Sequence, residues 1–324
     1  MILIVSEPGD PQVAAVVHRL EGTGHEVAVV DADRRFEVEL AFDAAPGGHG
    51  VARRASLRCD ARSIELDRAR VGWWRRLPPA VYTGALAGLG SGPAELGSRI
   101  ADTEALEGVL SALELSWMND PVRDRRARRR PLFWSAAVEA GLSLPRTLVT
   151  RDPEAALDFL REHRGDEVVS SALIRRADDW WGSSPVGGEE RLSERLREAE
   201  GELVLQPVVQ GVDVRVVVVG SAMFAVELEG RPADLPLDLA FADHGVRRTE
   251  LPDPVFDAVS ALMLRLDLST ASIDLRRTPE GDFVAIDLDP SPAWTLLEEL
   301  TAWPVTRAVA DALALRERVL TRRR

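Results

Sequence analysis

The hydrophobic and polar positions of the first thirty residues predict a strand, a helix and a second strand. Residues 2–6 form a short apolar run, and apolar residues recur at helical spacing between residues 10 and 24. Residues 25–31 again alternate as in a strand and end at an aspartate. A βαβ opening of this kind usually begins a parallel sheet.

The rest of the chain alternates between helical and strand-like segments. Residues 35–74 form short alternating segments separated by Gly, Pro or Asp, which predicts small hairpins, and residues 77–118 are mainly helical. Two strands near the end, 270–277 and 282–290, are joined by a turn in which Gly281 suits a hairpin. We therefore expect an α/β to α+β fold, with antiparallel pairs in the last third of the chain.

Composition limits the functional classes. The chain has 324 residues, enough for about two domains, and its 45% hydrophobic content can build a real core. A net charge of -13 disfavours nucleic-acid binding, since phosphate backbones repel an acidic surface. The sequence contains no transmembrane run and no signal-peptide pattern, and Cys59 is the only cysteine, so we expect a cytoplasmic protein with no membrane partner.

All 40 basic residues counted as Lys or Arg are arginines, so the chain contains no lysine. This composition excludes Schiff-base chemistry, a phosphate-binding lysine and a lysine general base. Drift in an arginine-rich proteome explains the bias without a function. Protection from lysine modification is the functional alternative.

The sharpest chemical feature is a set of three aspartates on the predicted C-terminal hairpin. Asp287 and Asp289 lie two positions apart on one strand, so both carboxylates project from one face, roughly 6–7 Å apart. Asp274 on the neighbouring strand can face them. Such oxygen-only ligands suit magnesium that bridges phosphates. The alternative is that all three lie on the solvated face of the hairpin.

Three further segments could carry chemistry. Arg215 shares a strand face with Asp213, where it could anchor a phosphate or an oxyanion, or simply pair with Asp213. The arginine-rich run 123–130 could receive an acidic peptide or phosphate, or could be a solvated face. The Trp/Gly-rich loop 178–188 could be a lid or a plain exposed loop. Residues 73–76, Trp-Trp-Arg-Arg, are expected to end a buried strand with both arginines outward.

These segments occur in an order that resembles the ATP-grasp ligases that cyclise ribosomal peptides, the graspetide or microviridin-type synthetases, including their N-terminal pre-ATP-grasp domain. The resemblance rests on six stretches: VGWWRR, WMNDP, AAVEAGLSLPRTLVTRDP, LQPVVQGVDVRVVVVGSAMFAVEL, ASIDL and AIDLDPSPAW. It covers nearly the whole chain. It implies a pre-ATP-grasp domain at residues 1–118, a central ATP-grasp subdomain at 119–200 and a C-terminal ATP-grasp subdomain at 201–324, with the first boundary at the break in residues 117–121.

In that family, ATP and magnesium activate a side-chain carboxylate of a precursor peptide as an acyl phosphate, and an amine or hydroxyl of the same peptide attacks it. The resemblance places the metal ligands at Asp274, Asp287 and Asp289 and the acyl-phosphate arginine at Arg215. It also implies an acidic precursor peptide as partner, and a homodimer.

The nucleotide site departs from the family pattern. The resemblance implies Arg130, Ser171 and Gln206 as cofactor-binding residues, but the first two fall where the family has phosphate-binding lysines. Arginine keeps the charge on a bulkier, forked group, whereas serine loses both charge and reach. The hinge residue after Gln206 is Pro207 instead of glutamate. Residues 238–240 are Asp-Leu-Ala, where the family shows Asp-Trp-Arg.

Three hypotheses follow for the function. The first is an active but divergent ATP-dependent peptide ligase. The second is a pseudo-ligase that binds a peptide or protein partner without ATP turnover. The third is an enzyme that reuses the cleft for different chemistry on an acidic substrate, with Asp287 or Asp289 as general base.

Overall fold

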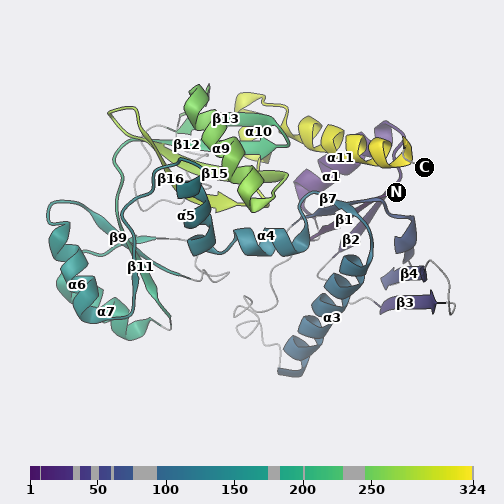
Figure 1. Ribbon diagram of the computed structural model, residues 1–324, viewed down its shortest axis with the longest axis horizontal. Helices are drawn as coiled ribbons and strands as arrows, with labels where there is room; N and C mark the ends of the chain where they lie inside the picture. Colours follow the sequence, from purple (N-terminus) through teal and green to yellow (C-terminus); the bar gives the residue numbers. More distant parts are fainter. Residues whose placement is uncertain are drawn as a thin grey trace. The chain divides into compact units, whose positions relative to one another are not determined.

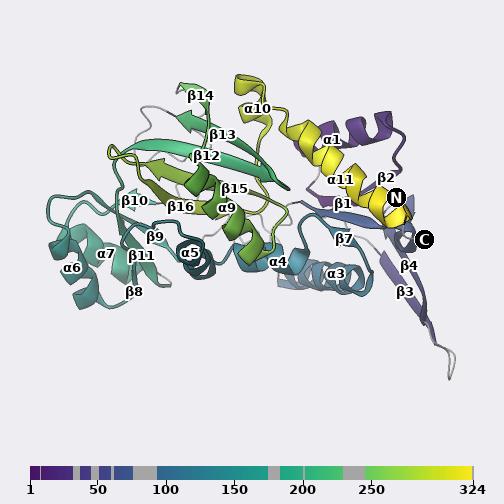
Figure 2. The same ribbon diagram turned by 45° about the horizontal axis from the view of Figure 1, so that its top comes forward.

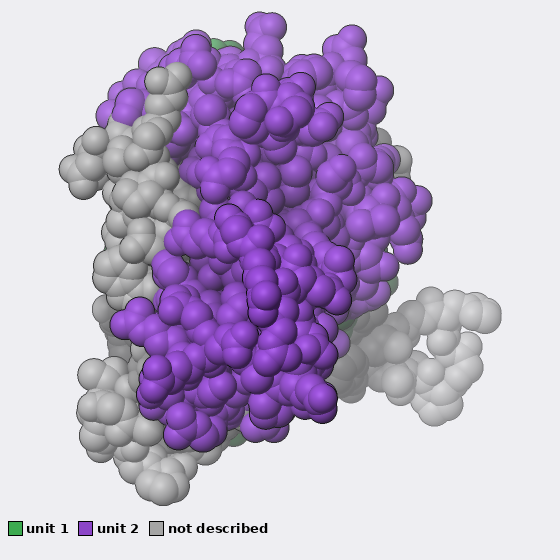
Figure 3. Space-filling view, turned by 90° about the vertical axis from the view of Figure 1, so that its left-hand side faces the viewer, with its two compact units in different colours: residues 1–124, 304–324 green, residues 125–303 purple. Residues whose placement is uncertain are grey.

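The structure, a computed structural model, describes residues 1–7, 9–31, 37–44, 51–59, 62–75, 93–173, 183–199, 201–228 and 245–322. Two compact units are coloured separately in Figure 3: Met1–Asp124 with Pro304–Arg324, and Arg125–Trp303. Among the described helices, none is long and apolar enough to cross a membrane. The division into domains at residues 118 and 200 stays a prediction, because packing units and evolutionary domains are different properties.

A four-stranded parallel sheet organises the first unit. Its strand order is β2-β1-β6-β7, with the bounds β2 (Val27–Asp31), β1 (Ile2–Ser6), β6 (Val71–Trp74) and β7 (Ser116–Trp117). Helix α1 (Pro11–Gly22) connects β1 to β2, as the sequence predicted. It begins where Asp10 accepts hydrogen bonds from the backbone N–H groups of Gln12 and Val13, with Pro11 in its first turn.

The prediction that residues 70–74 belong to a hairpin was wrong. Strand β6 pairs in parallel with β1, and all four of its residues are buried. A strand buried on both faces shows a continuous apolar run, which cannot be told from a short hairpin strand by periodicity alone. The outward orientation expected for Arg75 was also wrong: the side chain is only 1% exposed. Its Nε donates to Asp10 at 3.1 Å, and Nη2 donates to Gln12 at 2.5 Å.

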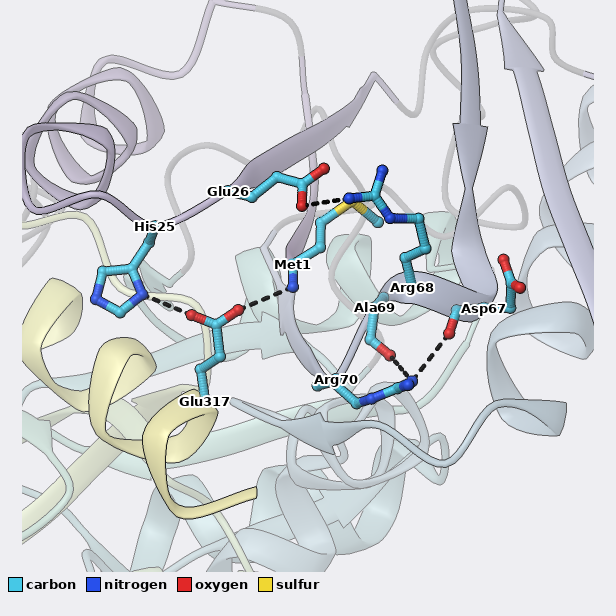
Figure 4. Close-up of polar contacts among 8 residues, drawn as sticks. All are labelled: Met1, His25, Glu26, Asp67, Arg68, Ala69, Arg70 and Glu317. Carbon is cyan, nitrogen blue, oxygen red and sulfur yellow. Dashed lines mark hydrogen bonds and ion pairs between the residues drawn. The ribbon is translucent and has the colours of Figure 1, made fainter. Parts of the chain in front are cut away.

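The remaining elements of the first unit are antiparallel strands and helices. The predicted hairpin region forms a sheet of order β3-β4-β5. The bounds are β3 (Glu37–Ala44), β4 (Val51–Cys59), β5 (Arg62–Glu65), the short 3-10 helix η1 (Leu66–Arg68), α3 (Pro93–Ala112) and α11 (Val305–Arg322). The C-terminal helix α11 packs against α1. Glu317 of α11 also binds the α-amino group of Met1 at 2.8 Å and His25 at 2.5 Å (Figure 4).

A five-stranded antiparallel sheet organises the second unit (Figures 1 and 2). Its order is β14-β13-β12-β15-β16, with the bounds β14 (Val246–Thr249), β13 (Ala222–Leu228), β12 (Val212–Val219), β15 (Thr270–Arg277) and β16 (Phe283–Asp289). Helices α5 (Arg130–Glu139) and α9 (Asp253–Leu266) pack an apolar core against one face of it. The predicted hairpin β15–β16 is confirmed: Gly281 has φ 96°, and Thr278 N–H donates to Asp282 at 2.8 Å in the turn.

A second antiparallel sheet lies in the same unit. Its order is β10-β9-β11-β8, with the bounds β10 (Ser184–Pro185), β9 (Val168–Ala172), β11 (Leu203–Pro207) and β8 (Leu148–Thr150). Helices α6 (Pro153–Glu162) and α7 (Glu189–Glu198) cover one face, where Phe159, Leu192 and Leu205 form the core. The unit also contains α10 (Thr295–Thr301) and the last three residues of α4 (Pro121–Ala127), which precedes α5.

Candidate active site

The two faces of the five-stranded sheet carry different chemistry. Residues paired across antiparallel strands project from the same face, so the printed register separates the faces directly. One face packs against α5 and α9 through Val214, Val216, Ile273 and Leu275. The opposite face carries every candidate from the sequence on these strands: Asp213, Arg215, Asp274, Asp287 and Asp289.

Arg215 and Asp274 are cross-strand partners and form the best-defined ion pair of this face. Nε of Arg215 donates to one carboxylate oxygen of Asp274 at 2.7 Å, and Nη2 donates to the other at 2.9 Å. The side chains are 8% and 18% exposed. A two-point contact fixes the plane of the guanidinium group, so Arg215 is held in one orientation. Asp213, which the sequence offered as a partner for Arg215, has its own ion pair with Arg276 at 3.6 Å.

Asp287 and Asp289 lie where the sequence placed them. Asp287 pairs with Asp274 across the hairpin, and Asp289 pairs with Ser272 one step along the same face. Asp289 accepts a hydrogen bond from the backbone N–H of Ser291 at 2.9 Å. It also contacts Nη1 of Arg128 at 3.3 Å. The prediction that these carboxylates share a face with Asp274 is therefore confirmed.

A magnesium ion does not fit these carboxylates in the arrangement observed. Among the described residues, no group of three or more His, Cys, Asp or Glu side chains could hold a metal ion. Asp274 has both oxygens on Arg215, and Asp289 has one oxygen on Arg128. The oxygen-only donor set has the chemistry that magnesium prefers, but arginines are bound to two of its three members. The assignment of Asp274, Asp287 and Asp289 as metal ligands stays a prediction.

The arginine-rich run supplies a second buried cation. Arg130 opens α5, is 8% exposed, and stacks over Trp134 with 5.1 Å between the guanidinium carbon and the ring centre. Its Nη1 donates to Oγ of Ser171 at 2.8 Å and lies 3.3 Å from the carbonyl oxygen of Ala172. The two predicted cofactor-binding residues Arg130 and Ser171 are therefore in direct contact. The alternative that the whole run 123–130 is a solvated face is therefore wrong for Arg130, which is buried.

Ser171 and Gln206 lie on one face of the second sheet. Ser171 pairs with Val204, and Gln206 pairs with Val169. The two pairs are separated by two residues on each strand, so Ser171 and Gln206 project from the same face. This face is opposite to the one that packs on α6 and α7, because Leu203 and Leu205 point into that core. Gln206 donates from Nε2 to Oγ1 of Thr147 at 2.8 Å. Its role as a cofactor-binding residue stays a prediction.

Two sequence candidates are not covered by the structure, and one contact was missed. Residues 178–182 of the Trp/Gly-rich loop and the segment 238–240 lie outside the described residues. The missed residue is Arg128, which the sequence grouped with the rest of the run. Its partner Asp289 is 161 positions away, so no local pattern could have identified the pair.

The comparisons with known proteins agree with this architecture. No protein-family model and no curated protein sequence matches the chain. Among solved structures, macrocyclase MdnC of Microcystis aeruginosa MRC, bound with precursor peptide MdnA, superposes with a TM-score of 0.78 at 20% identity, covering 97% of this chain and 99% of its own.

Two further structures are similar. A RiPP-associated ATP-grasp ligase of Chryseobacterium gregarium, in complex with ADP and a leader and core peptide, has a TM-score of 0.75 at 20% identity, covering 97% of this chain and 96% of its own. ATP-grasp ligase PsnB, complexed with minimal precursor, Mg and ADP, has a TM-score of 0.71 at 22% identity, with the same coverages. The chain therefore has the fold of the ATP-grasp ligases over nearly its whole length, as the sequence predicted.

Proposed function

We propose that the protein is an ATP-grasp ligase that joins a side-chain carboxylate to an amine or hydroxyl group of a ribosomally made peptide. The observation that carries the proposal is the polar face of the five-stranded sheet, where an oriented arginine and three carboxylates lie on a fold shared with precursor-bound macrocyclase MdnC. Buried charge opposite an apolar core is costly to a fold, so its presence favours a chemical role.

The proposed reaction proceeds in two steps. A carboxylate oxygen of the peptide attacks the γ-phosphorus of ATP, ADP leaves, and an acyl phosphate forms. The amine or hydroxyl then adds to the carbonyl carbon and loses its proton, and inorganic phosphate departs. In this scheme the guanidinium group of Arg215 stabilises the acyl oxygen, and Asp274 orients that group.

Arg130, Ser171 and Gln206 are the residues proposed to bind the nucleotide. A guanidinium group can make two parallel hydrogen bonds to phosphate oxygens. The guanidinium group of Arg130 is held toward β9 by its hydrogen bond to Ser171. An acidic precursor peptide is proposed to meet the exposed arginines of the run 123–130. A homodimer and a cytoplasmic location are retained as proposals that rest on the family resemblance.

Nucleotide binding tests the proposal first. We expect a non-hydrolysable ATP analogue to bind the purified protein in a calorimetric titration. The Arg130→Gln variant should bind about 10- to 100-fold more weakly, because a charged hydrogen bond contributes roughly 1.5–3 kcal/mol. Arg129→Gln removes the same charge from the neighbouring exposed position and serves as the control. Absence of binding at millimolar analogue would overturn the proposed ligase.

A peptide substrate tests the chemistry. Incubation with ATP and an acidic precursor peptide should remove one water mass for each bond formed, as measured by mass spectrometry. The Arg215→Gln variant should retain nucleotide binding but lose this product. Equal product formation by wild type and Arg215→Gln would remove Arg215 from the catalytic role.

A pseudo-ligase is the second candidate function. The observation that favours it is that Arg215 and Arg128 contact two of the three carboxylates proposed to bind metal. A pseudo-ligase would bind the peptide with the same affinity whether or not nucleotide is present, and the peptide mass would stay unchanged. Peptide binding that strengthens with the ATP analogue would instead favour the ligase.

A further inference from the structure

Arg130 and Trp134 lie one helical turn apart at the start of α5. Residues at positions i and i+4 of a helix are neighbours on one face. Here the guanidinium carbon of Arg130 lies 5.1 Å from the centre of the Trp134 ring. Trp134 also packs against the apolar core that α5 and α9 form with the five-stranded sheet. The core therefore anchors the ring, and the ring offers a flat face to the guanidinium group.

One edge of the same guanidinium group is held by β9. Nη1 of Arg130 donates to Oγ of Ser171 at 2.8 Å and to the carbonyl oxygen of Ala172 at 3.3 Å. The ring on a flat face and the two oxygen atoms at an edge together orient the plane of the group. A lysine side chain carries the same charge as a compact ammonium group, which has no plane to orient. These contacts therefore suit arginine and not simply any cation.

We propose that Trp134 is a positioning residue for nucleotide binding and acts through Arg130. The inference deepens the proposed function and rests on it, because Arg130 is the residue proposed to contact the phosphates. Paired hydrogen bonds from a guanidinium group to phosphate oxygens are directional, so affinity gains when the group is already oriented before the phosphate arrives. Trp134 supplies that orientation without itself touching the nucleotide.

Titration calorimetry with the non-hydrolysable analogue AMPPNP measures the effect of the ring. Trp134→Leu removes the aromatic face and should weaken binding about 10-fold, the scale of a partly desolvated cation–π contact. Trp134→Phe keeps an aromatic face and should stay within about threefold of wild type. The phenylalanine costs no hydrogen bond, because Nε1 of Trp134 is buried and has no acceptor among the described residues.

A charge-conserving variant and a double-mutant cycle show whether Trp134 acts through Arg130. Arg130→Lys should bind AMPPNP about 10-fold more weakly than wild type, although the charge is kept. In the Arg130→Lys background, Trp134→Leu should weaken binding by less than about twofold more, because the group that the ring positions is gone. Trp303→Leu is the matched control: it removes a tryptophan that stacks with Arg248 at 4.3 Å and should bind as wild type does.

Three results would overturn the inference while wild type binds AMPPNP and the ligase proposal stands. They are wild-type affinity in Trp134→Leu, wild-type affinity in Arg130→Lys, and additive losses in the double variant. Additive losses would mean that Trp134 contacts the nucleotide directly or acts through packing alone. Thermal unfolding checks each fold, and Arg130→Lys leaves the core contacts of Trp134 in place if Trp134→Leu is unstable. Absence of wild-type binding would overturn the ligase proposal and this inference together.

Discussion

The two faces of the five-stranded sheet are made by the same five strands but follow opposite rules. On the face toward α5 and α9, Val214, Val216 and Ile273 are fully buried among other apolar side chains. On the other face, Arg215 and Asp213 are nearly as buried, yet both are charged and ion-paired. The first face gains stability from removing apolar area from water.

The second face cannot be explained in the same way. A buried ion pair often contributes less stability than apolar residues of the same volume, because both charges lose their hydration. The proposed function accounts for this difference: under it, the polar face is retained for chemistry, while the apolar face supplies the stability that tolerates it. This division of roles between the two faces can be tested by placing a charge on the apolar face and by removing charges from the polar face.

A charge placed on the apolar face should produce the largest effect. Val216→Asp buries a carboxylate among the aliphatic side chains that the structure describes on that face, and we expect a loss of more than about 4 kcal/mol in the free energy of unfolding. Urea unfolding followed by circular dichroism measures it. The control is Val149→Asp on β8, where the wild-type side chain is 36% exposed and the cost should stay within about 1 kcal/mol. Similar losses for both variants would contradict the comparison.

Removing one member of the buried pair should have the next largest effect. Asp274→Ala removes the carboxylate that makes two hydrogen bonds to the buried guanidinium group of Arg215. We expect this to lower the free energy of unfolding by about 3–5 kcal/mol. Asp289→Ala, on the same face but more exposed, should cost about 1 kcal/mol or less.

An apolar replacement of the whole pair sharpens the distinction between stability and function. The double variant Arg215→Met/Asp274→Leu should recover most of the stability lost in Asp274→Ala, since both buried charges are gone. The same variant should form no ligated peptide. Recovery of stability together with full product formation would show that the pair has no chemical role.

The sequence predicted the positions on this hairpin well because they depend on local rules. Alternation puts Asp287 and Asp289 on one face, and the turn at Gly281 sets the register that brings Asp274 opposite Asp287. Partner choice followed no local rule. The two-point partner of Arg215 is Asp274, 59 positions away. Contacts of that separation depend on which strands become neighbours in the sheet.

The first unit shows the same limit. The βαβ opening was readable from apolar periodicity, but the addition of β6 beside β1 was not, and neither was the packing of the C-terminal helix α11 against α1. In each case the local sequence pattern was compatible with packing against more than one strand or helix. Which element is the actual neighbour is seen only in the packed structure.

Glu317 extends the comparison to a carboxylate outside the sheet and should give the smallest effect. Burial raises the pKa of Glu317, but hydrogen bonds and charge from the α-amino group of Met1 and from His25 outweigh it, so the pKa lies below its usual value (Figure 4). A carboxyl group with a lowered pKa in the folded protein stabilises the fold above its unfolded pKa. That contribution is lost as pH falls through the folded pKa.

Glu317→Gln should therefore destabilise the protein near neutral pH by under about 1 kcal/mol, since the contact is a partly exposed ion pair. Thermal unfolding measured from pH 7 downward should show the difference from wild type shrinking as acid protonates Glu317. The exposed Glu21→Gln on α1 should show no such trend. A difference that stays constant through acidic pH would mean that Glu317 acts through packing of α11 rather than through its charge, unlike the ion-paired carboxylates of the sheet.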